Sequence, residues 1–298
     1  MLDYAALKAL AAVIREGSFE RAARALHVTP SAVSQRIRLL EERVGCALVV
    51  RGQPCSATET GRRLCQHVDR VRLLEQELQG ALPALAREGI ARVALPVAVN
   101  ADSLATWFAP ALAAFAAEAP VLVEVAVDDQ DHTGEWLRSG AVLAAVTSTA
   151  RPAAGCNSQP LGAMRYLAAA SPAFVARHFA GGVGAGSLAA APSLVFNTKD
   201  ELQARWARRL CHRHVELPRH SLPSPQAFVT AALAGMGWGL QPQALVAGHL
   251  AAGRLVELVP CTPLDVALHW QHARAAAGLV EALSRRVETA ARAALLPP

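Results

Sequence analysis

The sequence predicts a helical region followed by an α/β region, and three observations support that division. Between Tyr4 and Val44 apolar residues recur every three or four positions, as they do on amphipathic helices. From Thr58 a longer segment keeps one apolar seam, which is typical of a helix that pairs with another helix. Beyond residue 92, apolar runs alternate with helical segments, the pattern of a parallel sheet. We therefore expect a multi-domain protein, all-α first and α/β afterwards.

Size and composition fit two folded domains. The 298 residues are 53% hydrophobic and 18% charged, which is enough apolar material for two cores and too little charge for a disordered chain. The longest run without an acidic or basic residue, 220–253, is interrupted by prolines and glycines, so it does not fit one membrane-spanning helix. The start, MLDYAALKAL, lacks the regions of a signal peptide. We expect a cytoplasmic protein without a membrane partner.

The sequence shows no strong metal or catalytic motif. The six cysteines form no C-x-x-C pair and fit small apolar fillers or free thiols. The run Cys211-His212-Arg213-His214 contains metal-ligand types, but it lies on an arginine-rich helix where exposure to solvent is the commoner role. There is no His-Glu-x-x-His and no Gly-x-Ser-x-Gly. We therefore expect no metal, no cofactor, no catalytic residue and no enzyme activity.

Three helices are predicted near the N-terminus, over residues 4–15, 19–26 and 30–44. Ser18 and Thr29 fit the N-caps of the second and third helices, and Pro30 fits the first helical position. Gly17 and Gly45 fit the ends of the first and third helices. This order, with a short second helix and a tight turn before the third, is typical of a helix-turn-helix DNA reader.

The third helix has two different faces. Its apolar positions form a predicted buried stripe of Val33, Ile37, Leu40 and Val44. The opposite face carries hydroxyl, amide and guanidinium groups near the N-terminal end, and such groups hydrogen-bond phosphates and base edges. A merely solvated face is the alternative, but such faces are usually rich in glutamate and lysine. Between residues 15 and 63, nine arginines stand against five acidic residues, which suits a polyanionic partner.

A hairpin wing is predicted after the third helix. Residues 47–51 form a short apolar strand, 52–54 a turn and 55–57 the way out, so that Arg51 lies at the tip and can reach a minor groove or a phosphate. We therefore predict a winged helix-turn-helix domain over residues 1–58 that binds double-stranded operator DNA. The predicted DNA contacts are Thr29, Pro30, Ser31, Ser34, Gln35, Arg36, Arg38 and Arg51.

A long linker helix is predicted over residues 59–86, with a hinge at 87–91. The predicted dimerisation seam consists of Leu64, Val68, Val71, Leu78 and Leu82. Because one reader helix contacts only a few base pairs, pairing of two chains would double the DNA site. Packing of the helix on the chain's own second domain is the alternative. We expect a homodimer or a homotetramer.

The N-terminal motifs, in their order, resemble those of the LysR-type transcriptional regulators. The chain keeps Gly17-Ser18-Phe19, Ala22-Ala23, the run from Leu26 to Ile37, Leu40-Glu41, Val44-Gly45, Arg51 and the run from Thr58 to Gly61. It departs from the pattern at Thr29, where many members have glutamine, and the role carried over there is that of the helix cap.

The remainder resembles the lysine- and arginine-responsive branch of this family, the ArgP/LysG type. The motifs are the runs 100–107 and 127–133, Phe196-Asn197 with Lys199-Asp200, and Phe228-Val229 with the run 234–240. The resemblance implies a periplasmic-binding-protein-like effector domain over 92–298, with lobe I at 92–161 and 267–298 and lobe II at 162–266. It also implies a small-molecule effector, lysine or arginine, control of genes such as a basic amino-acid exporter, and contact with RNA polymerase.

Polar residues follow the predicted strands of the second domain, at the edge where parallel sheets bind ligands. The predicted effector contacts are Asn100, Asp102, Ser103, Asp128, Asp129, Thr147, Asn197 and Ser224. Carboxylates there can hold a cationic side chain or an α-amino group, and the helix starts at Ser103 and Ser224 can bind a carboxylate. Aspartates after strands are also common helix caps, so a purely structural role for part of the cluster stays open. Trp107 and Trp238 are expected in the core.

Two other functions stay open at this point. A metabolic enzyme would turn over a candidate ligand, and a small-molecule-binding protein without DNA binding would fail to retard any DNA fragment. The helix-turn-helix pattern and the long linker helix favour a DNA-binding transcription regulator that senses a basic amino acid.

Overall fold

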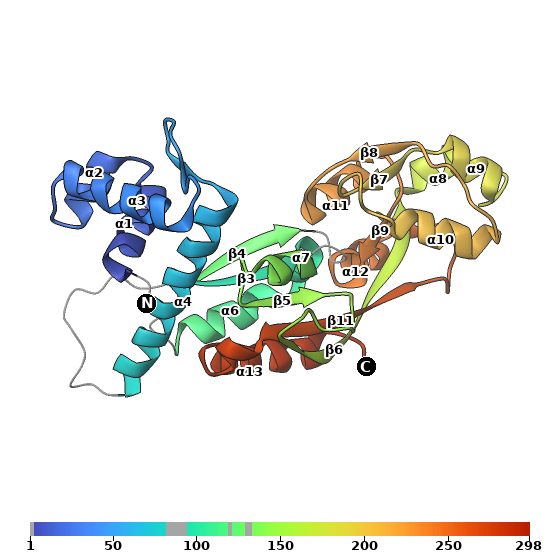
Figure 1. Ribbon diagram of the computed structural model, residues 1–298. Coiled ribbons are helices and arrows are strands. Elements are labelled where there is room, and N and C mark those ends of the chain that lie inside the picture. Colours follow the sequence, from blue (N-terminus) through green and yellow to red (C-terminus); the bar gives the residue numbers. More distant parts are fainter. Residues whose placement is uncertain (1–2, 82–93, 119–120, 129–132) are drawn as a thin grey trace. The chain divides into compact units, whose positions relative to one another are not determined.

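A computed structural model describes residues 3–81, 94–118, 121–128 and 133–298, which form two compact units (Figure 1). The first unit ends at Val93 and the second begins at Ala94. The hinge predicted at 87–91 lies outside the described residues. No helix in the described ranges is long and apolar enough to cross a bilayer.

The first unit is a helical head with a wing. Helices α1 (Tyr4–Glu16), α2 (Phe19–Ala25) and α3 (Pro30–Val44) are followed by strands β1 (Val49–Val50) and β2 (Ser56–Ala57) and by the long helix α4 (Glu59–Ala81). The three short helices lie within one residue of the predicted bounds at each end. Their apolar sides share one core, which includes Leu7, Leu10, Val13, Val33, Ile37, Leu40 and Leu48.

Side-chain caps explain where these helices begin. Ser18 Oγ accepts a hydrogen bond from the backbone N–H of Arg21 at 3.1 Å, and Thr29 Oγ1 accepts one from Ala32 at 3.2 Å. Gly17 ends α1 with φ +66°, a left-handed conformation that glycine adopts without strain. The capping roles predicted for Ser18 and Thr29 are therefore confirmed.

The end of α3 corrects one expectation about the core. The other three members of the predicted stripe are buried, but Val44 is 39% exposed. The helix ends at the next residue, Gly45, where its last turn has passed the edge of the core. Leu48, which is fully buried, fills the core after the turn instead.

The second unit contains a seven-stranded mixed sheet. Its order is β10-β6-β11-β5-β3-β4, and β9 also pairs with β6. The bounds are β3 (Ala94–Asn100), β4 (Leu122–Asp128), β5 (Ala144–Thr147), β6 (Cys156–Ala170), β9 (Gly239–Pro242), β10 (Val256–Glu257) and β11 (Leu264–Ala273). Strand β3 is parallel to β4 and β5, whereas β11 is antiparallel to β5 and β6. Strands β7 (Ser193–Val195) and β8 (Arg219–Ser221) form a separate parallel pair.

Helices divide this unit into two lobes. Lobe I carries α5 (Ala101–Ser103), the π-helical turn η2 (Leu104–Phe108), α6 (Ala109–Ala116), α7 (Thr133–Ser139), the short 3-10 helix η3 (Arg274–Ala276) and α13 (Ala277–Ala294). Lobe II carries α8 (Pro172–His178), α9 (Ala185–Ala190), α10 (Leu202–Cys211), α11 (Pro225–Leu233) and α12 (Gln243–Ala251). Figure 1 shows the two groups joined by the long strands β6 and β11, which run through both. The predicted alternation of strands and helices is confirmed.

Strands β6 and β11, which cross from one lobe to the other, are irregular at the boundary between the lobes. Their register shifts between Leu268 and His269, and Leu268 pairs with Gly162. Gly162 has φ +127°, and a Cβ there would collide with the backbone carbonyl of Leu296. Leu296 is hydrogen-bonded to Ala163 in both directions, at 2.9 and 3.0 Å. The C-terminal segment is thus tied across β6 at the lobe boundary.

Candidate DNA-reading surface and inter-lobe cleft

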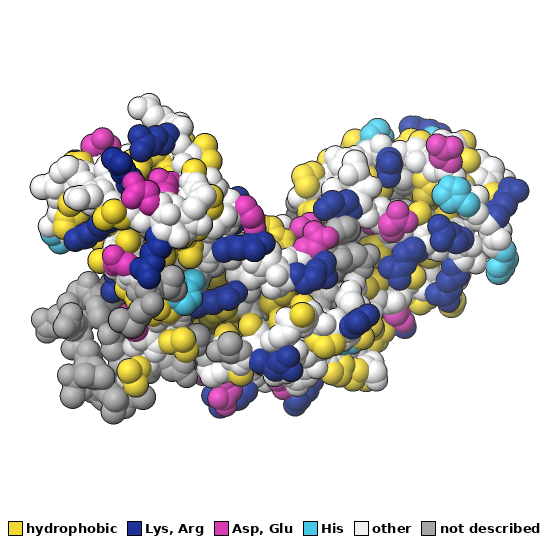
Figure 2. Space-filling model, viewed as in Figure 1, with side chains coloured by type: hydrophobic (Ala, Val, Ile, Leu, Met, Phe, Trp, Pro, Cys, Tyr) yellow, Lys and Arg dark blue, Asp and Glu magenta, His cyan; other side chains and the backbone are white. Residues whose placement is uncertain are grey.

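The exposed face of α3 presents several polar side chains. Ser31, Ser34 and Gln35 are exposed, and Arg36 is half-buried at the flank of the same face. Neither the Ser34 hydroxyl nor the Gln35 amide hydrogen-bonds to any described residue. Figure 2 shows basic and acidic side chains interspersed over the viewed face of the head, not gathered into one basic patch. The surface is therefore suited to reading base edges as well as to neutralising phosphates.

Side chains at the start of α3 and in its middle form local hydrogen bonds with one another. Thr29 and Ser31 share a hydrogen bond of 3.0 Å between their hydroxyls, and Pro30, also exposed, opens the helix. Arg38 Nε donates to Glu42 Oε1 at 2.9 Å. Such an exposed pair contributes little, typically about 0.2–1 kcal/mol, so a phosphate can readily replace the carboxylate.

The wing is fixed on the head at both of its ends. Glu41 Oε1 accepts a hydrogen bond of 2.7 Å from the backbone N–H of Leu48, next to β1. Thr58 Oγ1 donates to the carbonyl of Ala47 at 2.8 Å. Arg51 is exposed, and its guanidinium lies 5.8 Å from the centroid of the Phe19 ring, within cation–π range. Arg51 is thereby held beside the start of α2.

The seam of α4 divides into two parts. Val68 is buried in the core of the head, which corrects the dimerisation role predicted for it, and Leu64 is partly buried against the same core. Heptad spacing alone does not distinguish a partner helix in a second chain from α1 in the same chain. Val71 is half-buried and Leu78 is 52% exposed, whereas Leu82 lies outside the described residues. Leu74, which is not one of the five predicted seam residues, is 49% exposed.

A small cleft lies between the two lobes, where β3 and β4 end. The last residues of these strands, Asn100 and Asp128, are paired in register. Together with Asp102 they line a cavity of about 20 Å³, whose other walls are Ala101, Phe196, Asp200 and Leu202. Three of the predicted effector contacts are therefore brought together. Asp129, a fourth, lies outside the described residues.

The two lobe I carboxylates of this cleft are held in place by aromatic donors. The Tyr166 hydroxyl donates to Asp102 Oδ2 at 2.7 Å. The indole N–H of Trp136 donates to Asp128 Oδ2 at 3.2 Å. Tyr166 belongs to the crossing strand β6, so Asp102 is positioned by the element that joins the lobes.

Asp200 is a third carboxylate, supplied by lobe II and absent from the predicted contacts. It is 8% exposed. Its Oδ2 accepts the Phe196 N–H at 2.9 Å and its Oδ1 accepts the Leu202 N–H at 3.0 Å. Asp200 belongs to the motif Phe196-Asn197 with Lys199-Asp200, which carries part of the family resemblance. Only the fold shows that Asp200 lines the same cavity as Asp102 and Asp128.

Buried amides without partners lie in this part of the unit. Asn100 is 1% exposed, and within the described ranges neither its amide nitrogen nor its oxygen has a hydrogen-bond partner. The same holds for the hydroxyl of Ser103 and for the amides of Gln203 and Gln241. A buried polar group left unpaired costs about 1–3 kcal/mol, so the amide of Asn100, which lines the cavity, favours a ligand that pairs it.

The remaining predicted contacts form local hydrogen bonds. Thr147 Oγ1 accepts the Thr149 N–H at 3.1 Å, Asn197 Oδ1 accepts the Lys199 N–H at 2.7 Å, and Ser224 Oγ caps α11. None of the three lines the cavity. Their observed role is to fix turns and a helix start, which is the alternative left open for polar residues after strands.

Two other expectations concern tryptophan and metal ligands. Trp107 and Trp238 are 4% and 0% exposed, so both lie in the core as predicted. Across the described part of the chain, no group of three histidine, cysteine or acidic residues is arranged to hold a metal ion.

Family models match both units. The model of the bacterial regulatory helix-turn-helix proteins of the lysR family matches residues 4–62, and that of the LysR substrate binding domain matches residues 89–292. Among curated proteins, the chain is 46% identical over 299 residues to the transcriptional regulator ArgP of Pseudomonas fluorescens, covering 100% of this chain and 99% of that protein. It is 46% identical to the regulator LysG of Mycobacterium tuberculosis, covering 91% and 87% of the two chains.

Solved structures show the same architecture. The crystal structure of ArgP from Mycobacterium tuberculosis aligns over 100% of both chains with a TM-score of 0.83 and 42% identity. Full-length LysG from Corynebacterium glutamicum with bound effector Arg aligns over 99% of this chain and 100% of that one, with a TM-score of 0.73 and 37% identity.

Proposed function

Because this chain belongs to the LysR family of bacterial regulatory helix-turn-helix proteins, we propose that it binds operator DNA through α3 and the wing and responds to arginine or lysine bound between its lobes. The observation that carries the effector assignment is the convergence of Asp102, Asp128 and Asp200 on one cleft beside the unpaired amide of Asn100. The bound arginine of the LysG structure supports the same ligand class.

The DNA contacts divide into two kinds. Ser34 and Gln35 are exposed and unpaired in the described structure, so they are free to hydrogen-bond base edges in a major groove. Arg36, Arg38 and Arg51 carry charges that attract phosphates or a narrow minor groove. Thr29, Pro30 and Ser31 form the helix start. The helix dipole and the backbone N–H groups after Pro30, which itself has none, favour a phosphate there.

The cleft recognises a cationic amino acid by charge. The three carboxylates favour an ammonium or guanidinium group, and charge-assisted hydrogen bonds of this kind are the stronger class. The amide of Asn100 has both donor and acceptor atoms available for the α-amino and α-carboxyl groups.

Binding in this cleft requires the lobes to move. A cavity of about 20 Å³ holds about one water molecule, which is too small for an amino acid. We infer that the lobes separate to admit the ligand and close on it. A ligand shifts such an equilibrium only as far as it prefers one arrangement over the other.

Assembly of two or more chains would carry that shift to the DNA. We propose that Val71, Leu74 and Leu78 of α4 contribute to a homodimer or homotetramer, which places several heads along one operator. We propose that the regulated genes include one for export of basic amino acids. The same proposal includes contact of the DNA-bound protein with RNA polymerase.

Calorimetric titration of the full-length protein tests the effector. Arginine and lysine should bind, whereas their neutral counterparts citrulline and norleucine should bind at least tenfold more weakly, because they keep the shape and lose the charge. Asp128→Asn should weaken arginine binding more than citrulline binding. Equal affinities for arginine and citrulline, or binding of neither basic amino acid while another metabolite binds, would contradict the proposal. Turnover of arginine or lysine would contradict a purely regulatory role.

A further inference from the structure

A second cavity lies beside the crossing strands, and we propose that it binds a compact, largely apolar organic acid. Its volume of about 600 Å³ is within the range of small-molecule sites. Trp107 and Pro110 of lobe I and Ala244 and Ala247 of lobe II contribute walls. It shares no lining residue with the inter-lobe cleft, so it is a separate site.

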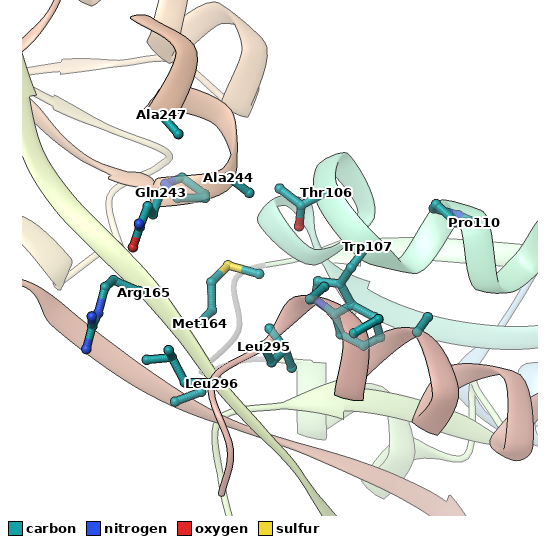
Figure 3. Close-up of a pocket in the computed structure, with 15 residues that line it drawn as sticks. Thr106, Trp107, Pro110, Met164, Arg165, Gln243, Ala244, Ala247, Leu295 and Leu296 are labelled. Carbon is teal, nitrogen blue, oxygen red and sulfur yellow. The ribbon is translucent and has the colours of Figure 1, made fainter. Parts of the chain in front are cut away.

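The walls require an apolar body in the ligand. Figure 3 shows Met164, Leu295 and the Trp107 ring around the space, with alanines of α12 on the side of lobe II. Further alanines of α13 extend this surface: Ala290, Ala293 and Ala294. Contact of such surface with water is unfavourable, at about 25 cal/mol per Å².

Arg165 and Thr106, two polar residues of the lining, are already engaged, whereas Gln243, which also lines the cavity, is exposed. Arg165 points to the other side of β6 from Met164 (Figure 3), and its Nε and Nη2 each donate to Asp265 at 2.8 Å. The Thr106 hydroxyl donates to the carbonyl of Asp102 at 2.7 Å. Neither side chain is therefore the group that selects the ligand.

Two independent features instead call for a hydrogen-bond acceptor. The Trp107 side chain is 96% buried, yet no described residue accepts a hydrogen bond from its Nε1. The nine-residue helix α12 begins at this cavity with Gln243 and Ala244, and no side chain caps its start. Free backbone N–H groups and the helix dipole favour a negative group there. A carboxylate on an apolar body suits either feature.

An occupant of this cavity would contact both lobes. Leu296, which is hydrogen-bonded to Ala163 of β6, is also part of the wall. The ligand would therefore hold the lobes at one relative position, at a place distinct from the cleft.

Calorimetric titration with 2-naphthoate, using the full-length protein, tests the site. Ala247→Phe fills the cavity, whereas Ala251→Phe changes another exposed alanine of the same helix that does not line it. Saturable binding is expected for the unchanged protein and for Ala251→Phe, with at least a tenfold loss in Ala247→Phe. Trp107→Phe keeps an aromatic ring and removes the N–H, so it should weaken binding by about three- to tenfold, as expected for one hydrogen bond.

Several results would overturn the proposal. They are the absence of saturable naphthoate binding, an equal affinity in Ala247→Phe and the unchanged protein, and competitive displacement of naphthoate by arginine. Unfolding midpoints that agree between the two phenylalanine variants show that both are folded. The arginine titration is read separately, so failure of this site is distinguishable from failure of the cleft.

Discussion

Replacement of Gly61 by alanine tests whether the wing is fixed on the long helix. Gly61 is buried in the first turn of α4, and an added Cβ would lie 3.0 Å from the carbonyl carbon of Leu48 and closer still to its oxygen. Glycine to alanine in a helix normally gains about 0.5–1 kcal/mol. Crowding of a packed site costs about 1–3 kcal/mol, and here the crowded atoms are backbone that cannot swing aside. We expect a net loss of about 1–2 kcal/mol.

Thermal unfolding of the full-length protein measures this loss. For a unit the size of the head, 1 kcal/mol corresponds to a shift of about 4–8 °C, so its transition should fall by roughly 5–15 °C. Gly248→Ala is the matched control, since Gly248 is an exposed helical glycine with nothing within 4 Å of the added Cβ. It should leave the transitions unchanged or slightly raised. A head transition in Gly61→Ala equal to that of the unchanged protein would refute the packing of α4 on Leu48.

Three further predictions concern the C-terminal segment, the thiol of Cys65 and the imidazole of His269. Gly162→Ala should destabilise the effector unit, because its Cβ would collide with the Leu296 carbonyl; an unchanged midpoint would show that the C-terminal segment is not tied there. Burial raises the pKa of the Cys65 thiol to about 11, so iodoacetamide at pH 8 should label exposed Cys46 first, and equal labelling rates would contradict this. Burial lowers the pKa of His269 below its ordinary value of 6.5, so the unfolded chain binds more protons and stability should fall as pH drops through that value. His269→Gln should reduce that fall, and an identical pH profile would contradict it.

The head could be predicted almost residue by residue because its signals are local. A cap such as Ser18 or Thr29 bonds to a backbone N–H three residues away, so spacing along the chain is enough to place the helix start. Periodicity likewise placed the buried side of α3, and failed only at its last turn.

The cleft and the seam depend on distant contacts, and there the sequence was less informative. The two lobe I aspartates followed from the rule that parallel strands end at one edge, whereas Asp200 faces them only because β6 and β11 bring lobe II across. The apolar spacing of α4 predicted one seam, but its first part, around Val68, packs on the head of the same chain.

The most direct test is the base preference of the full-length protein on a random-sequence DNA library. If the polar face of α3 lies in the major groove, Gln35→Ala should lose preference at one or two positions of the selected site. Arg51→Ala should keep the same preferences and bind all sequences more weakly. Identical changes in both variants, or a Gln35→Ala profile that matches the unchanged protein, would contradict the assignment of α3 as the reader.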